Sequence, residues 1–334
     1  MSSFRSGSSL DALGGFGRYA LTQVFRAIVI LWGAFTVTFF LLQMMPGDAV
    51  MIRFMDPELG LSPEQIEAMR VLYSGSSNPL VQYVHTIGQM LQGNFGYSVQ
   101  LGVPVATLIA AALPVTLRLA AVGFLLSLLW TLAIAVGASL LPLRWLRQAL
   151  HALPGFWSAI PLYWSGILII QLLSFRLHLL PVVGVGPWEG VILPAIAVSL
   201  PIAAPQAKLL LQQIEETEQL PFVMAIRTKG ASRASVFFRH ILPNSIIPSL
   251  TMAGLVFGEL IAGAIVTETV FGLNGLGHLT REAVSGQDVA VLQAIVMIGA
   301  TGFVVANLTV DLLIPLINPT LRSAPAGRKE TSGS

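Results

Sequence analysis

Cysteine is absent from this 334-residue sequence, and charged side chains are scarce. Without cysteine there is no disulfide framework, no thiolate zinc site and no thiol catalysis. Aspartate, glutamate, lysine and arginine make up 10% of the chain, whereas a soluble domain has about 25%. A soluble surface would need many more charges, so most of this surface must face lipid. A net charge of +2 also provides no basic surface for nucleic acid.

The sequence instead contains long runs of apolar residues. A helix of about 20 apolar residues crosses the hydrocarbon core, and six such runs predict an all-α integral membrane protein with about six transmembrane helices. The predicted spans are residues 27–47, 112–143, 152–175, 190–208, 240–268 and 289–316. The fourth contains Pro194, Pro201 and Pro205, which predict a kinked helix whose freed backbone groups are satisfied by neighbouring helices or water.

The distribution of basic residues predicts the orientation. Lysine and arginine favour the cytoplasmic side, and alternating the spans from an inside N-terminus puts 13 of the 18 basic residues inside. Both terminal segments, 1–26 and 317–334, are therefore expected in the cytoplasm. The 26 residues before the first span, and the length of its apolar run, are unlike a cleaved signal peptide.

Two connections between spans are long. The outside segment, 48–111, contains Ser62-Pro63-Glu64-Gln65, which predicts a short amphipathic helix that starts with a capping box. The inside segment, 209–239, is the most strongly charged stretch. Gly230 there can end a helix in a left-handed turn, and a second short helix is expected near Ser232. These helices would lie along the membrane surface, where anchoring to lipid headgroups would by itself account for the basic residues.

The inside segment also carries a recognisable order of residues. An alanine-containing helix, a glycine and then a Leu-Pro pair follow one another between Pro221 and Asn244. This order resembles the signature loop of ABC importer inner-membrane permeases, although Ile226 and Thr228 stand where that family usually has alanine. Other segments resemble its dipeptide, oligopeptide, nickel and opine-metallophore branch. They are Met45–Asp48, Gly93–Ser98, Leu113–Leu117, Thr267–Phe271, Gly275–Gly277, Asn307–Leu313 and Asn318–Pro319.

The resemblance implies an importer-type ABC permease fold and alternating access driven by a partner ATPase. Its implied partners are a second homologous permease subunit, two cytoplasmic ATPase subunits, an extracytoplasmic substrate-binding protein and the bilayer of the bacterial inner membrane. The cargo would be a peptide or similar small solute, with nickel or another metal chelate as the alternative. The residues implied in ATPase coupling are Phe222, Ala225, Arg227, Lys229, Gly230, Arg233, Leu242 and Pro243.

Two acidic residues stand in the fifth predicted span. Ionisable groups within a membrane face water or a partner group. Glu259, which has Gly258 and Gly263 nearby, either lies at a close helix contact or lines the translocation path. Glu268 either anchors the following loop or belongs to a gate. The other gate candidates, in the outer gate-like loop 269–288, are Phe271, Asn274, Gly275 and Gly277.

Patterns for catalysis and for metal binding are not evident. The chain lacks the Gly-Lys-Ser/Thr ending of a phosphate-binding loop, and its histidines show no metal-ligand spacing. We therefore expect a transport subunit and not an enzyme, with no cofactor or metal of its own and with ATP and magnesium used by partner subunits. An ion-coupled secondary transporter is the alternative from another class, but it would be expected to have inverted repeats and paired intramembrane charges.

Overall fold

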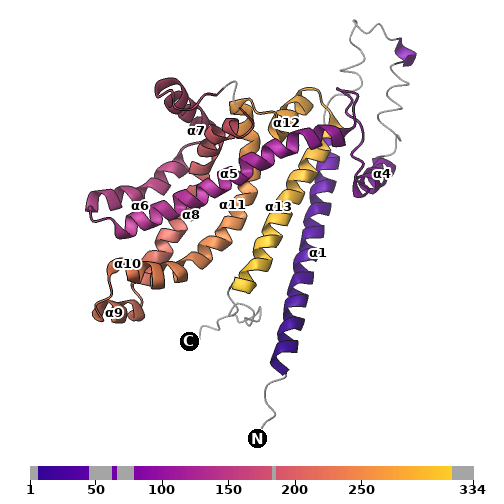
Figure 1. Cartoon of the computed structure of the whole chain (residues 1–334). Helices are drawn as coiled ribbons and strands as arrows, with labels where there is room; N and C mark the ends of the chain where they lie inside the picture. Colours follow the sequence, from indigo (N-terminus) through magenta and orange to yellow (C-terminus); the bar gives the residue numbers. More distant parts are fainter. Residues whose placement is uncertain (1–6, 45–61, 66–78, 183–185, 318–334) are drawn as a thin grey trace, which may run out of the picture.

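The computed structural model describes residues 7–44, 62–65, 79–182 and 186–317, and the regular elements in these ranges are helices (Figure 1). They comprise α-helices and two π-helices, η2 and η3. In chain order they are α1 (Gly7–Gln43), α4 (Pro79–Leu91), α5 (Val105–Leu140), α6 (Arg144–Ala159), α7 (Leu162–Ile169), η2 (Ile170–Arg176), α8 (Glu189–Glu218), α9 (Pro221–Thr228), α10 (Arg233–Val236), η3 (Phe237–Ile241), α11 (Leu242–Phe271), α12 (Leu276–Ser285) and α13 (Val289–Ile317).

Five stretches of helix among the described residues are long and apolar enough to cross a membrane. They belong to α1, α5, α8, α11 with its lead-in, and α13. A sixth crossing results if α6 and the helix that follows it count as one bent span. The protein is therefore an all-α membrane protein, as the sequence predicts.

The helices place two groups of elements at opposite ends of the molecule (Figure 1). The first turns of α1, the last turns of α13, and the short helices α9 and α10 lie at one end, called the inner end after the predicted orientation. Helices α4 and α12 lie at the opposite, outer end. The two candidate regions described below are thus separated by the length of the spans.

Helix α8 is the central element and packs against α5, α6, α7 and α11. Its three prolines lie within one helix that continues from Glu189 to Glu218. Pro201 leaves the carbonyl of Ala197 without its usual helical N–H partner. The hydroxyl of Ser165 in α7 donates to that oxygen at 3.1 Å. A neighbouring helix therefore satisfies this freed group, as membrane-embedded proline requires.

The structure divides some predicted segments differently. Residues 152–175, expected as one span, fall in α6 and in α7–η2, which are bent by 110° relative to each other. Pro161 stands at this break, because proline has no N–H with which to continue the preceding helix. Helix α8 reaches Glu218, so the expected inside connection 209–239 begins as helix. The expected loop 269–288 contains α12.

The capping box predicted in the outside segment is confirmed. The backbone N–H of Ser62 donates to Oε1 of Gln65 at 2.8 Å, and the N–H of Gln65 donates to Oγ of Ser62 at 3.3 Å. These two bonds satisfy N–H groups that the first turn of a helix leaves unpaired. The remainder of that predicted helix lies outside the described residues.

Candidate functional site

At the inner end, residues 221–243 form two short helices and a π-turn, here called the α9–α10 segment. Helix α9 begins with Pro221 at its first position and ends at Thr228. Gly230 then turns the chain with φ +84°, a left-handed conformation that glycine adopts without steric cost. The hydroxyl of Ser232 caps α10 by accepting the N–H of Ser235 at 3.3 Å. The helix, glycine turn and second helix predicted from the sequence are all present.

The π-turn η3 leads from α10 into α11. Pro243 supplies no N–H, and the wider turn lets Leu242 donate instead to the carbonyl of Phe237. The side-chain amide of Asn244 donates to the carbonyl of His240 at 2.6 Å. This connection therefore continues the helix across the Leu-Pro pair.

One face of the α9–α10 segment is buried in the protein. Val223, Val236, Phe237 and Ile241 are almost fully buried and pack with apolar residues of α5 and α8. This apolar cluster fixes the segment to the transmembrane helices, because each large side chain removed from water contributes about 1.5–3 kcal/mol.

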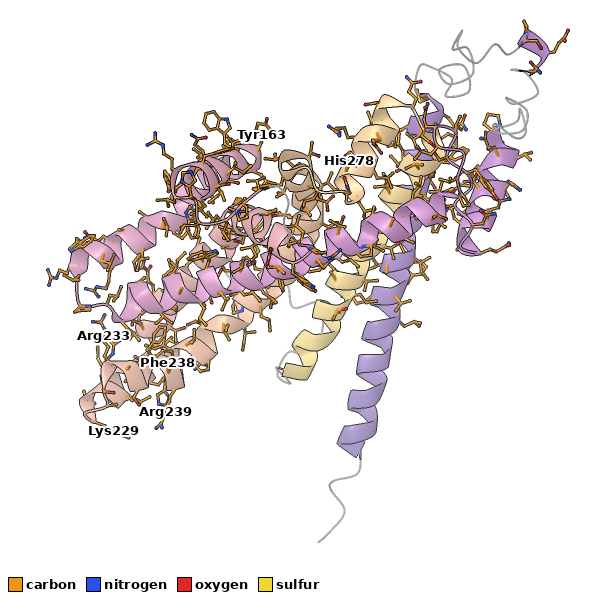
Figure 2. All side chains as sticks on the ribbon, turned by 45° about the horizontal axis from the view of Figure 1, so that its top comes forward. Tyr163, Lys229, Arg233, Phe238, Arg239 and His278 are labelled. Atoms are coloured by element: carbon orange, nitrogen blue, oxygen red, sulfur yellow. The ribbon has the colours of Figure 1, made fainter. Side chains whose placement is uncertain are left out.

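The opposite face of the segment is open. Met224 is 72% exposed and Phe238 50% exposed. Lys229, Arg233 and Arg239 are exposed beside them, and Figure 2 shows these basic residues gathered with Phe238 at the inner end. An apolar surface with a basic rim suits contact with another protein better than contact with water.

A buried hydrogen-bonded joint ties the two helices that flank the segment. The hydroxyl of Ser245, in the first turns of α11, donates to Oγ1 of Thr217 at 3.0 Å and lies 3.1 Å from the carbonyl oxygen of Gln213. Thr217 and Gln213 belong to the last turns of α8. These bonds therefore connect the last turns of α8 directly to the first turns of α11 on either side of the segment.

The structure brings the predicted coupling residues onto this one segment. Arg227 pairs with Glu218 at 3.2 Å, and because both side chains are partly exposed the pair contributes only about 0.2–1 kcal/mol. Leu242 packs against the buried cluster. The exposed members of the set are Phe222, Ala225, Arg227, Lys229, Gly230, Arg233 and Pro243.

At the outer end, Glu268 anchors the loop that joins α11 to α12. Its side chain is fully buried, and its Oε2 accepts the backbone N–H of Gly277 at 2.6 Å. The hydroxyl of Thr116 in α5 accepts the N–H of Leu276 at 2.9 Å. Side chains from two spans thus hold the first N–H groups of α12.

Glycines allow this loop to approach α11 closely. A Cβ on Gly275 would stand 2.4 Å from the carboxyl group of Glu268, and a Cβ on Gly277 would stand 2.3 Å from the carbonyl oxygen of Ile265. Phe271 is buried against α8, whereas Asn274 is exposed. The predicted gate candidates are therefore neighbours in space, but Glu268 itself faces the loop and not an open path.

Asp288 is a buried acid that sequence reasoning missed. Its Oδ2 accepts the hydroxyl of Ser98 at 2.5 Å and the N–H of Gln100 at 3.3 Å, and its Oδ1 accepts the N–H of Val291 at 3.3 Å. Gln100 also donates to the carbonyl of Gly286 at 2.8 Å. The lead-in to α5 and the start of α13 are therefore joined. An aspartate directly before an apolar run is an N-cap signal that could have found it.

Replacement of Asp288 by alanine is expected to destabilise the outer end. Three donors, two of them buried, would lose their acceptor, and a lost cap together with unpaired buried groups costs about 2 kcal/mol or more. The midpoint of thermal unfolding in detergent measures the effect. Glu282→Ala, at an exposed position of α12, is the control and should change the free energy of unfolding by less than about 0.5 kcal/mol. Equal midpoints for the two variants would contradict the assigned role.

Glu259 lies near the middle of α11 with its side chain exposed. Leu255 is 52% exposed and Val266 41% exposed on the same face of the helix, together with Thr251. Neighbouring Gly258 packs under Phe303 of α13, where a Cβ would come within 2.0 Å of the ring. The close helix contact predicted around Glu259 is thus made by its glycine neighbour, and Glu259 points away from it.

Comparison with known proteins gives one consistent result. The family described as "Binding-protein-dependent transport system inner membrane component" matches residues 129–323. The glutathione transport system permease proteins GsiC of Salmonella choleraesuis (strain SC-B67), Salmonella typhi and Escherichia coli (strain K12) are each 32% identical to this chain over 305 residues. Each alignment covers 91% of this chain and 98% of the relative.

Proposed function

This chain belongs to the family of binding-protein-dependent transport system inner membrane components, and we propose that it forms half of a pore that imports small peptides. It is an ABC importer permease, a multi-pass protein of the inner membrane and a transport subunit. Importers of this family work with ATPase and substrate-binding partners. The proposal adds a second permease subunit, two ATPase subunits at the inner end, and cytoplasmic termini.

The observation that carries the proposal is the α9–α10 segment. Its open face presents apolar and basic side chains, while its buried face is packed on α5 and α8. An ATPase that docks on the open face would move the segment when it binds ATP. The joint at Ser245 would carry this movement into α8 and α11, whose outer ends flank the loop anchored by Glu268. ATP and magnesium would act in the ATPase subunits.

The relatives support the choice of cargo. Their names give glutathione, a tripeptide, as the transported molecule. We propose a small peptide of this kind as the cargo of this chain. Family membership does not favour the ion-coupled alternative, and the names of these relatives do not favour a metal chelate.

Purification of the tagged chain from its own membranes tests the proposal. A nucleotide-hydrolysing subunit and a second permease subunit should accompany it. The complex, placed in vesicles with its binding protein, should accumulate labelled glutathione or trialanine only when ATP is present. Accumulation that follows an ion gradient and persists without ATP would overturn the proposal. Uptake of nickel chelates with no uptake of either peptide would overturn the choice of cargo.

A further inference from the structure

Glu259 exposes a carboxylate on a membrane helix whose other exposed side chains are mostly apolar. Among the described residues it is the acidic side chain exposed near the middle of the long apolar helix α11, and no described basic side chain forms an ion pair with it. A carboxylate at that depth is costly in lipid, so it must face water, a cation or another subunit.

Helix α11 cannot rotate to hide this carboxylate. Val256 and Leu260, which lie roughly 60° and 100° around the helix from Glu259, are almost fully buried against α5 and α8. The contact between Gly258 and Phe303 leaves no room for a side chain. Because these neighbours fix the helix, Thr251, Leu255 and Glu259 form a fixed outward stripe.

We infer that Glu259 lies in the translocation pathway and binds the cationic amine of the cargo, so that it sets the charge preference of the permease. This inference rests on the proposed function. Peptides differ in the number of amines they carry beyond the terminal ammonium, and a hydrated carboxylate attracts each additional positive charge and repels negative charge. The competing arrangement, a permanent ion pair with a second subunit, is less favourable because desolvation of two buried charges often exceeds their attraction.

The experiment uses the complete complex in vesicles with its binding protein and ATP. Two tripeptides differ in one charge, Ala-Lys-Ala and trialanine, and glutathione adds a cargo with net negative charge. Glu259→Gln should lower the uptake of Ala-Lys-Ala relative to glutathione by about tenfold, the factor given by one lost contact between charged groups. Glu259→Lys should lower this ratio further. Glu189→Gln, at an exposed position at the start of α8, should leave the ratio unchanged.

Two results would overturn the inference. An equal loss of all three cargoes in Glu259→Gln, with the second permease subunit missing from the purified complex, would assign Glu259 to a subunit contact. Unchanged uptake of every cargo would remove it from the pathway. Failure of the proposed function differs from both, because the unaltered complex would then show no ATP-dependent peptide uptake at all.

Discussion

Ala225→Trp should abolish ATP-driven uptake while leaving the permease folded. Ala225 is exposed on α9, so a larger side chain there would extend into solvent away from the buried face of the segment. It would, however, fill space that a docked ATPase must occupy. A disruption at the centre of a protein interface costs about 2 kcal/mol or more, which weakens docking roughly 30-fold. ATPase retention on the purified permease and peptide uptake in vesicles measure the effect.

The same variant separates ATPase docking from lipid anchoring. If the basic residues of the α9–α10 segment merely rested on lipid headgroups, tryptophan would be tolerated, because tryptophan favours the membrane interface. Ala149→Trp is the matched control, since Ala149 is exposed on α6 and lies outside the segment. Full uptake by Ala225→Trp would contradict the proposal that an ATPase docks on the open face.

Gly277→Ala is expected to have the largest effect on stability. The added Cβ would stand 2.3 Å from the carbonyl oxygen and 2.8 Å from the Cα of Ile265. Both are backbone atoms of α11, so no change of rotamer relieves the clash. Separating the loop from α11 would also break the bond from the Gly277 N–H to Glu268. Overpacking of this kind costs up to about 3 kcal/mol, occasionally more.

The yield of folded protein in detergent and its thermal midpoint measure this loss. Gly299→Ala provides the comparison, because a Cβ on Gly299 of α13 meets nothing within 4 Å. That variant should be as stable as the unaltered chain or slightly more stable, since alanine favours a helix by about 1 kcal/mol. If both alanine variants unfold at the same temperature, the predicted clash between a Cβ at position 277 and the backbone of Ile265 does not destabilise the protein.

Local signals in the sequence predicted those parts of the structure that depend on neighbouring residues. The thickness of the bilayer sets the length of an apolar run, so the spans could be recognised. Gly230 and the capping box at Ser62 act within one turn of helix and take their predicted conformations, and the second short helix starts near Ser232 as predicted. The bend at Pro161 was not predicted because the residues on both sides of it are apolar. A continuous apolar run does not indicate whether the helix bends within it.

Contacts between distant residues could not be predicted in this way. Ser98 and Asp288 are separated by 190 positions, and nothing around either residue indicates the other. The acid at Glu268 left an anchor and a gate both open, and only the fold brings Gly277 to its carboxylate. The pattern likewise left two interpretations of Glu259 open, because the exposure of a side chain depends on which helices pack beside it.

The buried joint at Ser245 has a consequence for how this permease can change in evolution. Thr217 and Ser245 close a loop whose ends are held together inside the protein. Substitutions on the open face between them can accumulate without disturbing the membrane helices, whereas the cargo preference inferred for Glu259 would be set by α11 further along the chain. Under the proposed mechanism, ATPase specificity and cargo specificity therefore depend on different parts of the chain and can change independently in evolution.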